Sequence, residues 1–493
     1  MLESAEVGHA IAKATFAREE RKLRVALLSG QFDMGAARRG PILILISGLE
    51  GGGRGETANK LNEWMDPRFV RTHAFGPGVA EEDARPLAWR YWRALPQRGR
   101  IGIFMNAWYR PLLNAHARHD ISHAQFNARL QEVRQYEQML TDEGIVLLKF
   151  WIHLSREAQK QRLQDLESSP NTRWRVTGID KQGLKHYNKY HDVWEQLLRE
   201  TSIGAAPWYV VEGTDHNYRN LTVGKILNEA LVKVNAGAKP APRAVVAPAP
   251  SVIGNVALIR RLDLTQKLED GPYESELAKW QAKLARLTSS RKFRRRSLVI
   301  ALEGADAAGK GGAIRRIATS FDARQFVIVP VAAPTEEELS HPFLWRFWQQ
   351  VPARGNITIF DRTWYGRVLV ERVEGYCGEA DWMRAYDEIN QYEEQLVRAG
   401  AIVCKFWLQI SKDEQLKRFH AREKTAFKRF KITSDDWRNR KKWNAYEQAV
   451  ADMVDRTSTE LAPWTLVEAE DKRFARVKIV KTIARQLERA LDD

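Results

Sequence analysis

A glycine-rich loop carries the most specific chemical pattern in the chain. It has the sequence Gly-Ala-Asp-Ala-Ala-Gly-Lys-Gly-Gly and follows the apolar run Leu298–Leu302. Its glycines let the backbone turn tightly and direct successive N–H groups at an oxyanion, and the next helix adds its positive end. Lys310 brings a point charge to phosphoryl oxygens, as in the GxxxxGK part of the P-loop pattern. The predicted phosphate-binding glycines are Gly304, Gly309, Gly311 and Gly312.

Two aspartates are candidates for holding a magnesium ion. The serine or threonine that usually helps to hold Mg²⁺ is replaced by Gly311, which leaves Asp306 as the hard-oxygen substitute inside the loop. Asp361 stands at the end of the candidate strand Asn356–Phe360. In a P-loop sheet, a second metal-holding carboxylate belongs at this point. We predict that Asp306 and Asp361 hold Mg²⁺. The alternative for Asp306 is a helix N-cap or turn residue, which aspartate also favours.

Two arginines close to Asp361 are candidates for binding phosphate groups. Arg362 and Arg367 can each form paired hydrogen bonds with phosphate oxygens. The alternative is a surface ion-pair cluster that caps a helix, but the intact phosphate loop favours the catalytic interpretation. The predicted catalytic residues are therefore Asp306, Lys310, Asp361, Arg362 and Arg367.

A basic segment after the apolar run Ile402–Leu408 is a candidate lid. Its early part has helical spacing, whereas its later part, through Thr433 and Trp437, lacks a clean apolar stripe. Such a segment could close over the site and exclude water from phosphoryl transfer. The alternative is a solvated basic helix. Its basic residues are Lys417, Arg418, Arg422, Lys424, Lys428, Arg429 and Lys431.

The chain contains two copies of one module. A degraded glycine loop begins at Gly48, and 304 minus 48 gives an offset of 256 residues. The same offset relates Trp89-Arg90-Tyr91-Trp92 to Trp345-Arg346-Phe347-Trp348, Gln135-Tyr136-Glu137 to Gln391-Tyr392-Glu393, and Pro207-Trp208 to Pro463-Trp464. Coincidences at one spacing over separate segments indicate domain duplication. We expect modules over residues 1–235 and 253–493, joined by an Ala- and Pro-rich linker over residues 236–252.

The first module has lost most of the predicted chemistry. By the offset, Lys310 corresponds to Arg54, Asp306 to Glu50, Asp361 to Met105 and Arg362 to Asn106. Methionine is not a ligand for Mg²⁺, which prefers oxygen. Glu50 and Arg54 could retain weak binding of metal or anion without turnover. We therefore predict a single catalytic site, in the second module.

Apolar runs alternate with longer amphipathic stretches, which predicts an α/β fold with a parallel sheet flanked by helices. Ligands in such sheets bind beyond the carboxyl ends of the strands. The segments Ala5–Ser29 and Tyr273–Ser290 have helical spacing and are expected to pack as outer helices. The expected strands of the second module are Leu298–Leu302, Phe326–Val331, Asn356–Phe360, Ile402–Leu408 and Trp464–Glu468.

The overall composition points to a polyanionic partner. Lys and Arg number 78 against 62 Asp and Glu, giving a net charge of +16, although a solubilising surface is an equally ordinary explanation. Cys377 and Cys404 are the only cysteines, so a disulfide framework is not expected and a reducing cytoplasm fits. No apolar run approaches membrane-spanning length. We expect a cytoplasmic protein without a membrane partner.

These motifs resemble the second family of polyphosphate kinases. The loop matches its GxDxxGKGG motif, and Asp361 to Arg367 match a DRSWYxR-like motif with Thr363 in place of serine. The resemblance spans nearly all of residues 270–475, and a weaker version covers about residues 20–220. It implies a P-loop kinase-like fold in each of two tandem modules, with a helical lid over the catalytic one.

The fused form is similar to the subgroup that transfers phosphate from inorganic polyphosphate to AMP. The resemblance then implies Mg²⁺-dependent direct transfer that gives ADP, with both aspartates at the metal. It also implies that basic lid residues lie along the phosphate chain. These candidates are Arg418, Arg422, Lys428 and Lys431.

Three alternatives remain open. An ATP-dependent kinase of a nucleotide or other small metabolite would use the same P-loop parts. A nucleic-acid-binding protein would fit the positive charge and the 17 tryptophans, but no known nucleic-acid module is present and many aromatic residues recur in both halves, as core residues would. We expect no nucleic-acid partner. The first module could serve a structural or dimerising role, which leaves homo-oligomerisation open.

Overall fold

A computed structural model describes residues 2–237, 256–425 and 432–492. The chain divides into two compact units. Unit 1 comprises Met1–Gly78, Arg90–Arg243 and Thr335–Phe343, and unit 2 comprises Val79–Trp89, Ala244–Pro334 and Leu344–Asp493. The expected linker, residues 236–252, lies almost entirely outside the described residues.

Unit 2 is built on a parallel five-stranded sheet in the order β10-β9-β6-β8-β7. Every expected strand is confirmed to within one residue at either end, except that β6 extends two residues further, into Gly304. The apolar run that begins at Leu298 places β6 at the centre, where all but its last residue is buried. The strands are β6 Ser297–Gly304, β7 Phe326–Pro330, β8 Ile357–Asp361, β9 Ala401–Gln409 and β10 Trp464–Glu468.

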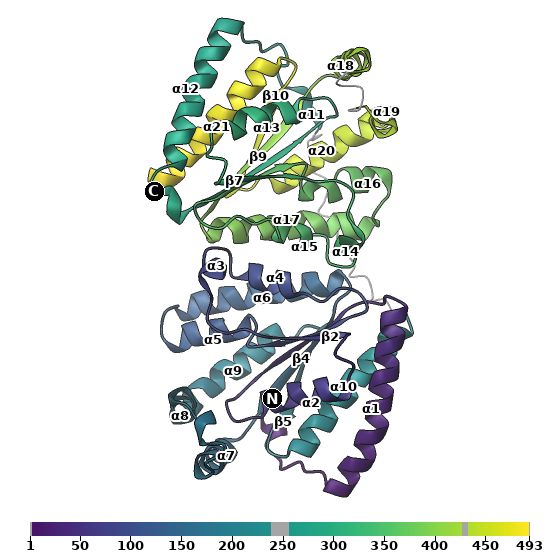
Figure 1. Ribbon diagram of the computed structural model, residues 1–493, viewed down its shortest axis with the longest axis vertical. Coiled ribbons are helices and arrows are strands. Elements are labelled where there is room, and N and C mark those ends of the chain that lie inside the picture. The colour runs from purple at the N-terminus through teal and green to yellow at the C-terminus, as the bar shows by residue number, and fades with distance from the viewer. Residues whose placement is uncertain (1, 238–255, 426–431, 493) are drawn as a thin grey trace. The chain divides into compact units, whose positions relative to one another are not determined.

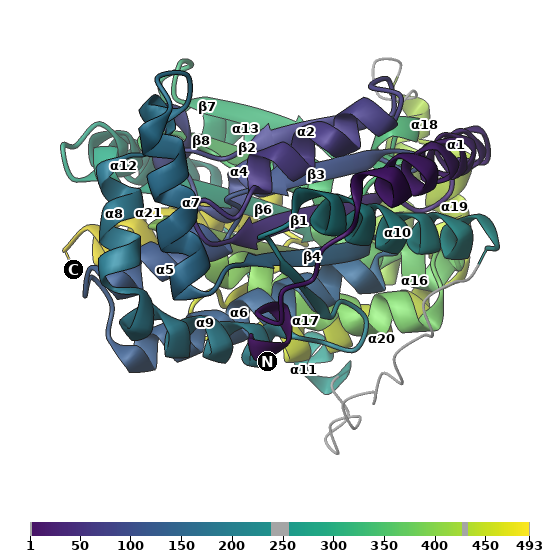
Figure 2. The same ribbon diagram turned by 90° about the horizontal axis from the view of Figure 1, so that it is seen from below.

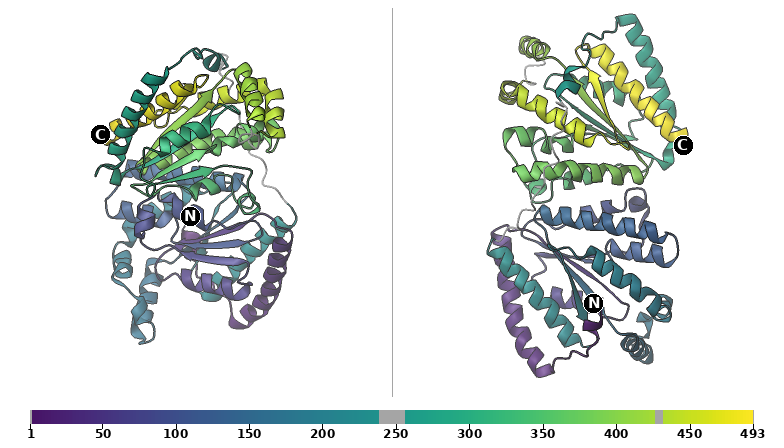
Figure 3. Two further views of the ribbon diagram at one scale, coloured as in Figure 1. Left: turned by 45° about the horizontal axis from the view of Figure 1, so that its top comes forward. Right: turned by 180° about the vertical axis from the view of Figure 1, so that it is seen from behind.

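Helices cover both faces of the unit 2 sheet. α12, α13 and α21 lie on one face, and α17 and α20 lie on the other (Figures 1 and 3). The helices from residue 256 onward are α11 Val256–Arg260, α12 Asp270–Thr288, η3 Phe293–Arg295, α13 Lys310–Ala318, α14 Glu336–Leu339, α15 Trp345–Trp348, η4 Trp364–Arg367, α16 Val370–Glu374, α17 Glu379–Arg398, α18 Lys412–Lys424, α19 Ser434–Lys441, α20 Trp443–Thr457 and α21 Lys472–Asp492.

Unit 1 repeats this architecture. Its sheet has the order β2-β3-β1-β4-β5, which becomes the order of unit 2 when each strand is replaced by its counterpart at the 256-residue offset. The register is also the same, since Ile46 lies beside Met105 in unit 1 as Leu302 lies beside Asp361 in unit 2. The strands are β1 Ile42–Gly48, β2 Val70–Ala74, β3 Ile101–Met105, β4 Val146–His153 and β5 Trp208–Glu212.

The sequence predicts two outer helices, and the observed bounds match the prediction more closely for the second helix than for the first. α12 matches its prediction within a few residues, whereas α1 begins at Lys13 and runs to Ala36, later than the predicted Ala5–Ser29. α1 packs along α10 (Figure 2). The helices before residue 256 are η1 Glu3–Ala5, α1 Lys13–Ala36, α2 Arg54–Trp64, α3 Ala80–Asp83, α4 Ala88–Ala94, α5 Tyr109–Ala117, α6 His123–Asp142, α7 Arg156–Ser168, η2 Arg173–Arg175, α8 Gly178–Lys185, α9 Tyr187–Thr201 and α10 His216–Asn235.

Each unit buries an apolar core between its sheet and its helices. In unit 2, Leu298 and Ile300 of β6 are fully buried in a cluster that also contains Leu284 of α12 and Ile483 of α21. With both faces of the sheet covered, the carboxyl ends of the strands are left to carry polar loops.

Candidate active site

The phosphate loop connects β6 to α13. Gly304 passes close to β9, because a Cβ at this position would lie 2.7 Å from the carbonyl oxygen of Leu408. Gly309 has a left-handed φ of +113° and caps α13. Lys310, the first residue of that helix, donates from Nζ to the carbonyl oxygen of Gly304 at 2.7 Å. The ammonium group therefore lies over the loop, at the helix end that favours an anion.

The end of β8 delivers a second set of side chains to the same place. Asp361 lies beside Leu302 in the sheet, two residues before the loop begins at Gly304. Arg362 follows with a left-handed φ of +64°, and its Nη2 lies 3.5 Å from Oδ1 of Asp306. A left-handed arginine is uncommon, and such strain is concentrated at functional sites. The structure thus brings Asp306 and Arg362 into contact, with Asp361 on the neighbouring strand end.

Arg367 takes a different position from the one expected for a direct phosphate clamp. Its Nη1 pairs with Glu371 of α16 at 3.3 Å, and its side chain is 15% exposed. This pairing connects the 3-10 turn η4 to α16. A role for Arg367 in phosphate binding stays a prediction.

Asp306 has a partner that the sequence did not indicate. Asn439 of α19 donates from Nδ2 to Oδ2 of Asp306 at 2.9 Å. The corresponding residue in unit 1 is Gly183, so this contact has no counterpart there. Asn439 lies two residues beyond Trp437, where the predicted lid segment ended, and no sequence signal marked it as a partner of Asp306.

Arg418 is buried and fully hydrogen-bonded within the protein, so its role in phosphate binding stays a prediction. Arg418 is 6% exposed, and its five N–H groups are matched by five acceptors. The guanidinium therefore braces the phosphate loop from behind instead of facing a ligand. Its acceptors are Oε1 of Glu414 and the carbonyl oxygens of Ala307, Ala308, Ala469 and Glu470.

The candidate lid comprises α18 and α19. Arg422 of α18 is partly buried, which lowers its pKa, while Asp436 and Asp306 oppose this shift. α19 is held to α16 because Glu374 pairs with Arg438 at 3.0 Å and with Lys442, just after α19, at 2.9 Å. Lys428 and Lys431 lie outside the described residues, so their predicted contact with phosphate stays a prediction.

A pocket adjoins the phosphate loop and combines two kinds of surface. The described residues that line it include Gly304, Asp306 and Arg362 on the polar side. Leu369, Trp443 and Val450 form part of the apolar side. A ligand with a phosphate at one end and an aromatic ring at the other would match both sides.

Glu303 also lines this pocket and was not a candidate from the sequence. It is 6% exposed, and burial raises its pKa while the charge of Lys310 works in the opposite direction. A carboxylate directly before the glycine loop, where unit 1 has Ser47, was the available signal.

The corresponding site in unit 1 is neutralised internally. Glu50 pairs with Arg54 and, at 2.5 Å, with Arg110. Burial opposes ionisation of Glu50, but the two guanidinium groups outweigh it and hold its pKa below the usual value. Arg54 also donates to Oδ1 of Asn106 at 3.3 Å. In unit 1 the loop carboxylate is therefore already paired with arginine side chains, at the position where unit 2 has Asp306, the candidate metal ligand.

A buried polar network supports the β8 loop and is retained in both units. In unit 2, Glu393 accepts from Trp364 at 3.0 Å and Tyr365 at 2.6 Å, and it pairs with Lys405 at 2.7 Å. In unit 1, Glu137 accepts from Trp108 and Tyr109 and pairs with Lys149. The duplication thus retained the scaffold of the loop and replaced the side chains at its tip.

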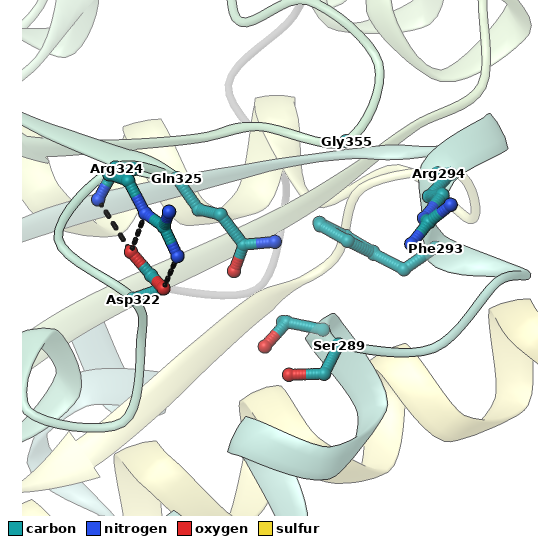
Figure 4. A pocket seen from close by; sticks show the side chains of 8 residues that line it. Ser289, Phe293, Arg294, Asp322, Arg324, Gln325 and Gly355 are labelled. Carbon is teal, nitrogen blue, oxygen red and sulfur yellow. Dashed lines mark hydrogen bonds and ion pairs between the residues drawn. The ribbon is translucent and has the colours of Figure 1, made fainter.

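A second pocket of unit 2 lies at the opposite end of the sheet. It is lined by Ser289, Phe293 and Gln325 and by an ion pair between Asp322 and Arg324 (Figure 4). It lacks the glycine loop and the strand-end carboxylates.

Within the described ranges, no helix is both long and apolar enough to cross a membrane.

Comparison with known proteins decides the family. The family model described as polyphosphate kinase 2 (PPK2) matches residues 10–239 and 267–493, one match in each half. The chain belongs to the polyphosphate kinase 2 family. The resemblance expected from the motifs is therefore confirmed for both modules.

Full-length relatives share the fused form of this family member. The chain is 52% identical over 493 residues to a polyphosphate:AMP phosphotransferase of Pseudomonas aeruginosa, covering 99% of each protein. It is 37% identical over 475 residues to a protein of the same name from Acinetobacter johnsonii, covering 95% of this chain and 96% of the relative. A crystal structure from Pseudomonas aeruginosa PA01 that bears the polyphosphate kinase 2 name matches with a TM-score of 0.91 at 50% identity, covering 100% of both chains.

Proposed function

We propose that unit 2 transfers a phosphoryl group from inorganic polyphosphate to AMP and so produces ADP. The observation that carries this proposal is the pocket that opens onto the phosphate loop, with Asp306 and Arg362 on one side and Trp443 on the other. The names of the full-length relatives support the same reaction.

The two substrates would occupy different parts of the site. The phosphate chain would lie over the loop amides and Lys310, whose charge balances the phosphoryl oxygens. The adenine ring of AMP would lie against the apolar wall formed by Leu369 and Trp443, with its phosphate towards Arg362. Direct in-line transfer needs no side-chain nucleophile, so positioning and charge balance would supply the catalysis.

The donor atoms around the loop suit a magnesium ion. Asp306 and Asp361 provide the hard carboxylate oxygens that Mg²⁺ prefers. Among the described residues, no group of three or more His, Cys, Asp or Glu side chains forms a complete metal cage. Magnesium is commonly held by one or two carboxylates together with substrate phosphates. A bound magnesium ion would neutralise charge that develops on the transferred group.

The decisive experiment offers AMP with two donors. Purified full-length protein is incubated with AMP and either long-chain polyphosphate or ATP, in the presence of magnesium, and ADP formation is followed. We expect ADP from polyphosphate in the absence of ATP. Product formation with ATP alone would instead support an ATP-dependent kinase, and it would refute the proposed donor.

We further propose that the first module, residues 1–235, is degenerate and has no transfer activity of its own. The internal pairing of Glu50 with Arg54 and Arg110 supports this.

Both Cys377 and Cys404 are free thiols, which fits a protein of the cytoplasm. Polyphosphate and AMP are the partners that we propose.

A further inference from the structure

A buried carboxylate joins the two loops of the active site. Glu303 is the last residue of β6 before Gly304, and its Oε1 accepts a hydrogen bond from the Thr363 hydroxyl at 2.8 Å. Thr363 is 1% exposed, and its Oγ1 also accepts from the backbone N–H of Tyr365 at 3.1 Å. The Thr363 hydroxyl therefore has a fixed orientation, and it fixes the carboxylate in turn.

The surroundings of Glu303 are cationic. Burial raises its pKa, whereas the charges of Lys310 and Arg362 lie close enough to lower it. These two side chains are the cations that we assign to the phosphate groups. Lys310 binds the carbonyl oxygen of Gly304, the residue after Glu303, at 2.7 Å, and Arg362 directly precedes Thr363. The bond between Glu303 and Thr363 therefore connects the two segments that carry these cations, and it can hold their positions before the phosphate chain binds.

Burying a carboxylate is costly, so its presence needs a reason. The fold does not supply one, because unit 1 has Ser47 and Ala107 where unit 2 has Glu303 and Thr363. Despite this loss, β1 and β3 of unit 1 pair in the same register as β6 and β8. The residue after the strand also keeps its left-handed backbone, with φ of +54° at Asn106 and +64° at Arg362.

The duplicated chain thus separates two classes of buried polar residue. The network around Glu393 and Lys405 occurs in both units, as expected for residues that build the fold. The bond between Glu303 and Thr363 occurs only where Lys310 and Arg362 are also present. It therefore belongs with the chemistry of the site.

We propose that Glu303, oriented by the Thr363 hydroxyl, is a positioning residue of the transfer reaction and holds Lys310 and Arg362 in place for the transferred phosphoryl group. The proposal rests on the proposed function for the identity of the reaction. It adds a carboxylate whose effect is exerted through two cations and not through the metal.

Two substitutions separate positioning from support of the fold. Glu303→Gln removes the charge and keeps the shape, and Thr363→Val removes the hydroxyl and keeps the volume. We expect kcat to fall on the order of 100-fold in either variant, since a small misplacement of reacting groups has effects of this size. The KM for polyphosphate should stay equal or fall for Glu303→Gln, because one negative charge near the anion is lost.

Stability provides the control. Loss of a buried carboxylate should leave the thermal midpoint of Glu303→Gln unchanged or raise it. Thr363→Ser retains the hydroxyl and should restore kcat to within about threefold of the wild type, since a hydroxyl is all that the contact needs. Loss of activity together with an equal loss of stability in Glu303→Gln would overturn the proposal, as would wild-type kcat in that variant or failure of Thr363→Ser to restore activity.

Both polyphosphate and ATP are assayed as donors for every variant. A wild-type enzyme that works only with ATP would refute the proposed function, but the ratio of variant to wild-type kcat would still test Glu303 with that donor. A wild-type enzyme that works with polyphosphate, beside variants of equal kcat, would refute only the role of Glu303.

Discussion

The buried pair of Glu393 and Lys405 allows a quantitative test of how the active-site loop is supported. Lys405 is 0% exposed, and its Nζ contacts Glu393 at 2.7 Å, the Tyr365 hydroxyl at 2.9 Å and the carbonyl oxygen of Thr457 at 2.7 Å. In Lys405→Met the side chain stays long and apolar, but the Glu393 carboxylate loses its counter-ion. The Trp364 and Tyr365 side chains then share a buried carboxyl without a cation.

The expected loss follows from this burial. Removing one partner of a fully buried ion pair typically costs about 3–5 kcal/mol, a large part of the roughly 5–15 kcal/mol that stabilises a domain. With an m-value near 2.5 kcal/mol per M of urea, which is ordinary for a domain of this size, the midpoint falls by about 1–2 M. Lys149→Met removes the matching cation of unit 1 and serves as the matched control.

The assay measures the urea concentration at which half of the transfer activity is lost, together with tryptophan fluorescence. We expect the activity midpoint of Lys405→Met to fall by about 1–2 M of urea. Lys149→Met, by contrast, should keep a near-normal kcat in the absence of urea. A double variant, Glu393→Gln with Lys405→Met, removes both charges and should recover part of the loss. An activity midpoint for Lys405→Met within about 0.3 M of the wild type would refute the reasoning, since a shift that small corresponds to less than about 1 kcal/mol.

The same variant has a defined pH dependence. Burial already raises the pKa of Glu393, and Lys405 is the group that lowers it most. Without Lys405 the pKa rises further, so the folded state binds more protons than the unfolded state. The stability of Lys405→Met should therefore fall as the pH rises from about 5 to about 8, relative to wild type. A loss that grows towards low pH would contradict this assignment.

Three further predictions concern the two loops. Lys310→Ala should lower kcat by about 100-fold or more because it removes a preorganised charge, whereas Arg54→Ala in unit 1 should leave kcat within about twofold; equal losses would assign catalysis to both units. Asp361→Asn should abolish transfer, and chelation by EDTA should stop wild-type transfer until magnesium is restored; EDTA-resistant activity would exclude the metal. Glu50→Ala should have little effect on the transfer rate, and a large loss of transfer would show that the first site works. In the double variant Glu50→Ala with Lys310→Ala, calorimetry should detect pyrophosphate binding to unit 1, because the guanidinium groups that Glu50 held are released.

Much of the fold and part of the site followed from local sequence patterns. The apolar runs fixed the strands because a strand buried on both faces needs an uninterrupted apolar segment. The glycine and lysine spacing identified the phosphate loop because few other residues allow that backbone. The 256-residue offset revealed the duplication and the loss of Lys310 and Asp361 from the first copy. The sequence alone therefore determined the architecture and predicted which half carries the chemistry.

Only the tertiary structure decided how polar side chains far apart in the chain meet. Asn439 contacts Asp306 across 133 residues, and Glu303 contacts Thr363 across 60. Arg418 is of a residue type that often binds phosphate, but its guanidinium donates hydrogen bonds to backbone carbonyl oxygens of two loops. Each of these residues is an ordinary polar residue in its own segment. Its role depends on which loop the folded sheet places opposite it, and that is set by strand order and helix packing, which no local spacing encodes.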